Sequence, residues 1–143
     1  MNEAESAKIL SMLAAAFPHS YSRLTEDDTA TEIMLWTQMF EDCPYKLVEA
    51  AVLTCIKSSK SEFAPSVSTV SSQIENLRQI ITQCAYGYLL EEYCGDAARK
   101  FPPAVRAYIN HCAARMYEKS TGRQFTSQAQ KQLAYQASLT DGK

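Results

Sequence analysis

Residues 36–70 decide the fold, and they read WTQMFEDCPYKLVEAAVLTCIKSSKSEFAPSVSTV. The stretch begins with the end of an apolar helix, marked by the aromatic pair of Trp36 and Phe40. The next segment is apolar at nearly every position between Leu47 and Ile56, which leaves little polar surface and is typical of a central, buried helix. A short polar turn then leads into a third helix. The stretch therefore predicts three consecutive helices joined by tight turns.

The two junctions within this stretch carry helix-start signals. Pro44 lacks an N–H that the first turn of a helix would leave unpaired, so it suits that turn, with Asp42 or Cys43 as the cap. The second junction is the Phe-Ala-Pro-Ser sequence at 63–66. We expect Phe63 to fold back onto the core and Ser66 to cap the following helix.

Helical patterns also precede this stretch. Residues 4–17 have apolar side chains at a helical spacing, and Thr25, followed by three acids, predicts the N-cap of the next helix. That helix has Trp36 on one apolar face and Leu35 and Met39 on a neighbouring one. Such a wide apolar stripe predicts that more than one neighbour covers it.

A long apolar stripe follows, with alternating spacings of three and four residues. This a/d pattern predicts a long helix, either packed within the chain or forming a coiled-coil homodimer through Ile74, Leu77 and Ile81. We favour packing within the chain, because Glu/Lys pairs do not flank the stripe systematically. The stripe consists of Val67, Val70, Ile74, Leu77, Ile81, Cys84 and Tyr88.

The second half of the chain is also helical in pattern. A helix is expected to start at Pro103, to bury Val105, Ile109 and Met116, and to end at Gly122. A weaker helix is predicted from residue 126. The whole is all-α: a compact N-terminal bundle over residues 1–75, then a long helix and further C-terminal helices over 76–143.

Composition places the chain among soluble intracellular proteins. Apolar residues make up 46% and charged residues 21% of the 143. The five cysteines form no C-x-x-C pair, which favours reduced thiols in a cytosol over a disulfide framework. No apolar run approaches the roughly 18 residues that a membrane span needs, so we expect no membrane contact.

Charge is unevenly distributed along the chain. Residues 1–64 hold five Lys/Arg and ten Asp/Glu, whereas residues 99–143 hold eight Lys/Arg and two Asp/Glu. This asymmetry is consistent with a basic tail that meets an acidic partner, and equally with a solvated helical tail. Because the basic residues are spread out, we expect only weak or indirect contact with nucleic acid.

The sequence offers no support for an enzyme. It has no P-loop, no G-x-S-x-G elbow and no H-E-x-x-H pattern. His19 and His111 are far apart in sequence, and a partly buried helix histidine is the favoured interpretation of His111. Adjacent acids on a helix point about 100° apart, so they form no acid/base pair. We expect no cofactor, no metal and no catalytic residues.

Several of these elements together resemble the phage replicative helicase loader/inhibitor family, which are small loaders without an ATP site. The resemblance covers about the first half of the chain, and Phe101-Pro-Pro103 looks like an element of related phage proteins. The matching elements are Ala16-Phe17-Pro18, Tyr21, Leu24, Trp36, Met39-Phe40, Asp42, Pro44-Tyr45, Val48, Ala51-Val52, Ile56 and Phe63-x-Pro65-Ser66-Val67.

The resemblance implies a compact helical N-terminal domain and a C-terminal region that engages a hexameric DnaB-type helicase. The helicase would be restrained and delivered to a phage origin in the host bacterial cytosol. An origin-bound initiator would be a possible second partner. The alternatives are a helical adaptor or inhibitor of another host protein, and a DNA-binding regulator, which the acidic N-terminal half disfavours.

Under this interpretation the partner-binding residues lie in the basic C-terminal region. Aromatic residues and arginines are common interface anchors, and rim charges mainly set the association rate. The apolar anchors we predict are Phe125, Leu133 and Tyr135, and the charged rim consists of Arg115, Lys119, Arg123 and Lys131.

Overall fold

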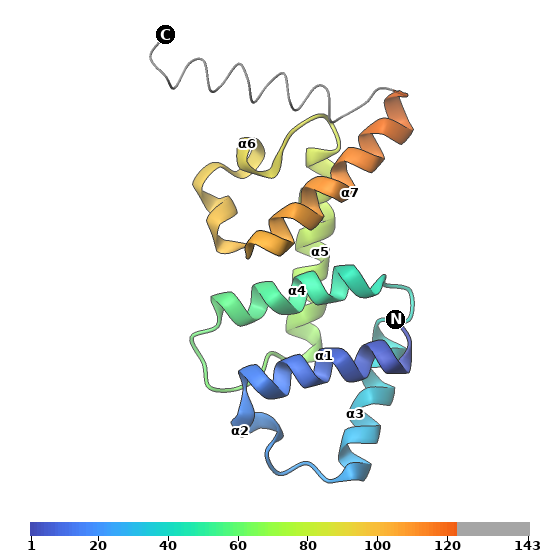
Figure 1. The fold of residues 1–143 in the computed structure, drawn as a ribbon, viewed down its shortest axis with the longest axis vertical. Coiled ribbons are helices and arrows are strands. Elements are labelled where there is room, and N and C mark those ends of the chain that lie inside the picture. Colours follow the sequence, from blue (N-terminus) through green and yellow to red (C-terminus); the bar gives the residue numbers. More distant parts are fainter. Residues whose placement is uncertain (123–143) are drawn as a thin grey trace. The chain divides into compact units, whose positions relative to one another are not determined.

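The computed structural model describes residues 1–122, and its secondary structure confirms the all-α prediction, with no strand in that range (Figure 1). Short turns join the helices, and a single 3₁₀ segment precedes the last one. The elements are α1 (Glu3–Ala16), α2 (Pro18–Tyr21), α3 (Glu26–Met39), α4 (Tyr45–Ser58), α5 (Val67–Cys84), α6 (Leu90–Cys94), η1 (Gly95–Lys100) and α7 (Pro103–Thr121).

The chain divides into two compact units. The first holds residues 1–77 together with Lys100–Pro102, and the second holds residues 78–99 and those from Pro103 onward. The boundary falls inside α5, two residues after the one we expected at 75. Our assignment of the two parts as separate domains with different roles stays a prediction.

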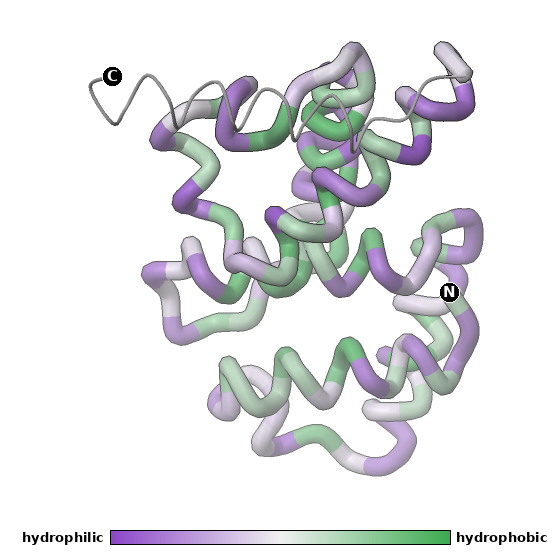
Figure 2. Tube along the Cα trace, turned by 45° about the horizontal axis from the view of Figure 1, so that its top comes forward, coloured by the Kyte–Doolittle hydropathy of each residue, from purple (hydrophilic) through white to green (hydrophobic). Residues whose placement is uncertain are grey.

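In the first unit, α1 packs against α2, α3 and α4 (Figure 1). Figure 2 shows apolar and polar residues alternating along these helices, as expected for helices with one buried face. Trp36 stacks at a tilt on Phe40, with 5.4 Å between ring centroids. The predicted central helix, α4, is buried along most of its length. The core of this unit includes Ile9, Leu13, Trp36, Phe40, Leu47, Val48, Ala51, Val52 and Phe101.

The start of α3 confirms the predicted N-cap. The Thr25 hydroxyl accepts the Asp28 amide at 3.1 Å, and the Asp28 carboxylate accepts the Thr25 amide at 3.1 Å. This reciprocal pair is a capping box, and it satisfies two amides that the helix itself leaves unpaired. A similar box between Asn2 and Glu5 starts α1.

Replacing Thr25 by Ala should lower the free energy of unfolding by about 1 kcal/mol, because the Asp28 amide then loses its side-chain acceptor. Thermal or urea unfolding followed by circular dichroism measures the change. The matched control is Thr31→Ala, whose hydroxyl only donates to the Asp27 carbonyl within the helix. Equal destabilisation by both substitutions would contradict a capping role for Thr25.

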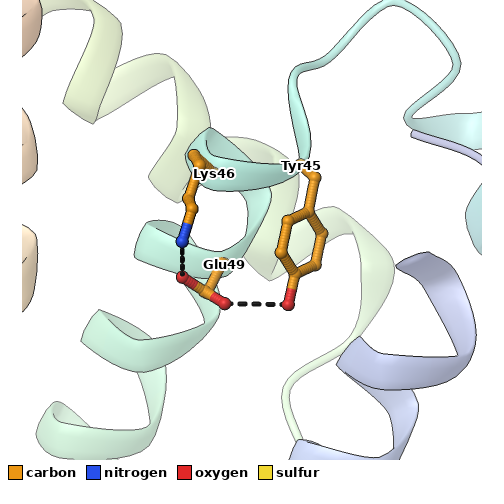
Figure 3. Close-up of polar contacts among 3 residues, drawn as sticks. All are labelled: Tyr45, Lys46 and Glu49. Atoms are coloured by element: carbon orange, nitrogen blue, oxygen red, sulfur yellow. Dashed lines mark hydrogen bonds and ion pairs between the residues drawn. The ribbon is translucent and has the colours of Figure 1, made fainter.

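The start of α4 differs from our prediction. Pro44 itself is the N-cap, and no side chain caps the helix, so neither Asp42 nor Cys43 does so. Instead the first turn is held by side chains further along. The Tyr45 hydroxyl donates to Glu49 Oε2 at 2.8 Å, and Lys46 Nζ lies 3.5 Å from Glu49 Oε1 (Figure 3).

The hydrogen bond to Glu49, together with partial burial, raises the pKa of Tyr45 to about 12. The neutral phenol is therefore favoured in the folded state, so its stabilising contribution is present below pH 10 and is lost as the pH rises towards 12. We expect Tyr45 to stay neutral at about pH 10.5 and Glu49→Gln to lower its pKa towards 10. NMR of ring-labelled tyrosine, assigned with Tyr45→Phe, measures both values. Unchanged titration in Glu49→Gln would disprove the assigned cause.

Two apolar predictions in the first unit are wrong. Leu35 and Met39 are 43% and 55% exposed, because α3 packs mainly on α1 and a single neighbour covers a single face. Phe63 is 70% exposed. The turn before α5 is attached to α2 by its backbone instead, since the Ala64 amide donates to Ser20 Oγ at 2.8 Å. The Ser66 hydroxyl does accept the Thr69 amide at 3.2 Å, as expected of a cap.

The apolar stripe of α5 is buried from Val70 to Cys84, which confirms packing within the chain. Ile74, Leu77 and Ile81 are 2%, 0% and 7% exposed, so they offer no free seam in the chain as described. A homodimer stays a prediction without this seam to support it. The stripe ends earlier than we expected, because the helix stops at Cys84 and Gly87 follows with φ 119°.

Candidate protein-interaction surfaces

Of the seven partner-binding residues that we predict, two lie in the described part of the chain. Arg115 and Lys119 are both on α7, and both are exposed. They stand four residues apart, so they are neighbours along one side of the helix. The other five lie outside the described residues: Arg123, Phe125, Lys131, Leu133 and Tyr135.

Helix α7 presents these two basic residues because its other side is buried. The buried side chains recur every four residues, at Val105, Ile109, Ala113 and Tyr117. We expected Met116 in this series, but it is 44% exposed, since Tyr117 holds the next inward position. Gly122, with φ 71°, follows the last turn, and its amide donates to the Glu118 carbonyl at 2.8 Å.

A polar contact between elements holds α6 against α7 within the second unit. The Asn110 side chain accepts the Leu90 amide at 2.8 Å and donates to Glu91 at 3.4 Å. This pairs an amide that the start of α6 would otherwise leave open. Further along α7, Leu89 packs on Tyr117. The loop before α6 therefore lies along the C-terminal half of α7.

That loop carries exposed aromatic residues that our predictions did not include. Tyr86 and Tyr88 are 73% and 49% exposed, and they flank Gly87. A Cβ on Gly87 would come within 3.4 Å of the Tyr117 ring, so a glycine lets the backbone approach α7. Tyr93 on α6 is 46% exposed. The Tyr-Gly-Tyr sequence was the available signal, since a glycine between aromatic residues marks a turn that cannot continue the buried stripe.

The second unit thus combines exposed tyrosines with the exposed cations of α7. This is the residue composition of many protein interfaces, in which aromatic residues and arginines contribute most of the binding energy. In the first unit, comparison with known protein families gives a direct result. Residues 1–71 match the family model of the phage helicase loader/inhibitor N-terminal domain.

Through this domain the chain belongs to the phage helicase loader/inhibitor family. The match runs from α1 through α4 into the start of α5, and it confirms the family that the sequence resembles. Membership implies binding to a replicative helicase, which is in general a non-enzymatic role. No curated protein and no solved structure matches the chain significantly.

The hollow between α1, α2 and α3 of the loader is a small apolar pocket of about 250 Å³. Its one carboxylate, Glu32, accepts the Trp36 indole N–H at 3.2 Å. Burial, with a contribution from the Glu32 charge, raises the pKa of the neighbouring Tyr21. A single, already bonded carboxylate beside a neutral phenol supplies structure to α3 and not a general acid/base pair.

Metal-binding side chains do not gather in the described part of the loader. Within residues 1–122, no three His, Cys, Asp or Glu side chains are grouped so that they could hold an ion. His111, which we expected to be partly buried, is exposed on α7. None of the described helices has the length and apolar character that a membrane crossing requires.

Proposed function

We propose that this loader binds the hexameric replicative helicase stoichiometrically, restrains its activity and delivers it to a phage origin in the host cytosol. The observation that carries the proposal is the loader/inhibitor N-terminal domain over residues 1–71. Restraint and delivery would both follow from one contact, if the loader occupies the helicase until another protein releases it.

The two halves of the chain are proposed to divide the work. The acidic N-terminal bundle would be the stable scaffold and the part that meets an origin-bound initiator. The basic C-terminal region would dock on the helicase, with Arg115 and Lys119 of α7 at the rim. Their exposure supports this assignment, since rim charges accelerate association with an acidic surface.

The proposal is tested by gel filtration of the full chain with the host's replicative helicase and ATP. We expect the two proteins to co-elute and ATP hydrolysis to fall in proportion to the loader bound. Bovine albumin at the same concentration is the control for non-specific suppression. Separate elution at micromolar concentrations would contradict helicase binding, and co-elution with unchanged hydrolysis would contradict restraint.

A further inference from the structure

The outward side of α3 carries a group of large apolar side chains that the fold does not use. Met34, Leu35 and Met39 are 52%, 43% and 55% exposed. Leu35 and Met39 are one helical turn apart, and Met34 lies beside them. We call these three residues, with the exposed Asp27, Thr31 and Gln38 on the same side, the α3 outer face.

The opposite side of α3 accounts for its packing in the bundle. Trp36 and Phe40 are each 2% exposed. Thr37 is held by a 2.7 Å hydrogen bond between its hydroxyl and that of Ser6 on α1. These contacts fix α3 without any contribution from the outer face. Single exposed apolar residues are ordinary, but three side by side on one helix indicate a contact surface.

A shallow groove of about 530 Å³ runs along one edge of the α3 outer face. Ala30, Ile33 and Met34 form its apolar wall, and Glu3 and Asp27 place carboxylates on its rim. The groove therefore offers an apolar floor beside negative charge. That is the pattern a helix with one apolar and one basic side would match.

The charge around the α3 outer face has a single sign. Six acids occur between Glu26 and Asp42, and no Lys, Arg or His lies between Arg23 and Lys46. A second copy of this chain would bring the same acids together across a two-fold interface, which opposes self-association. A cationic partner gains from the same charges.

We propose that the α3 outer face is a docking site for a basic amphipathic helix of a partner protein. The apolar side of that helix would lie on Leu35 and Met39 and enter the groove beside Met34. Methionine side chains are flexible and polarisable, so they can adapt to such a surface. The site is independent of the C-terminal region to which we assign the helicase, and its existence does not rest on helicase binding.

The test is a titration of the ¹⁵N-labelled full chain with a synthetic helical peptide. The probe has Leu at every third or fourth position and Lys elsewhere, and its twin has Glu in place of Lys. We expect amide shifts centred on Asp27, Thr31, Met34, Leu35 and Met39, and weaker binding at higher salt because the pairing is electrostatic in part. The Glu twin should bind at least about tenfold more weakly.

The matched variants are Leu35→Gln with Met39→Gln, and Phe63→Gln as an exposed apolar control in the same unit. Gln keeps helix propensity, so both variants should melt like the wild type. The double variant should weaken binding by about tenfold or more, and the control should bind normally. Met39→Gln alone replaces the double variant if the latter melts early. Shifts centred away from α3, equal binding of the Glu twin, or normal binding by the double variant would overturn the proposal.

Discussion

A chain ending at Gly122 is expected to lose its binding to the replicative helicase, by about a hundredfold or to below detection. The truncation removes the predicted anchors Phe125, Leu133 and Tyr135, and a few such anchors carry most of an interface's free energy. It should leave the first unit folded, because the buried side chains of that unit all precede Pro103. The expected result is thus a folded scaffold that has lost one partner.

Gel filtration with the helicase, beside circular dichroism of the truncated chain alone, measures both parts of this prediction. The comparison variant is the full chain with Arg115→Gln and Lys119→Gln. We expect it to bind more slowly and with less dependence on salt, but still to co-elute, since exposed charges mainly change the association rate. If the truncated chain co-elutes as well as the full chain does, the helicase contact lies within residues 1–122.

Ile74→Asp is expected to unfold the chain instead of dissociating a dimer. Ile74 is 2% exposed, so the new carboxylate would be buried without a partner, at a cost of about 4 kcal/mol or more. A domain of this size has only about 5–15 kcal/mol of stability in total. We therefore expect the cooperative melting transition to shift strongly downward or to disappear.

The matched control is Asn76→Asp, which adds the same charge at an exposed position of α5. It should melt within a few degrees of the wild type, since surface substitutions usually change stability by about 0.5 kcal/mol or less. Sedimentation velocity distinguishes the two interpretations of the apolar stripe. A folded Ile74→Asp variant that sediments as a smaller species than the wild type would establish a dimer seam through α5.

Local signals predicted the helices well because helix formation depends on neighbouring residues. The Thr25 and Asp28 pair, three positions apart, is enough to specify a capping box wherever the helix ends up. The glycines after α6 and α7 likewise adopt positive φ, as helix-ending glycines do. The family followed from the order of such elements in the first half, and the match over residues 1–71 confirms it.

The sequence alone therefore determined the all-α architecture, most of the helix starts and the family, since each rests on contacts between residues close in the chain. Only the tertiary structure decided which apolar residues are buried. Trp36 and Met39 have equal claims by periodicity, yet they are 2% and 55% exposed. Helical spacing states which direction a side chain points, but the number of neighbouring helices decides whether anything covers it.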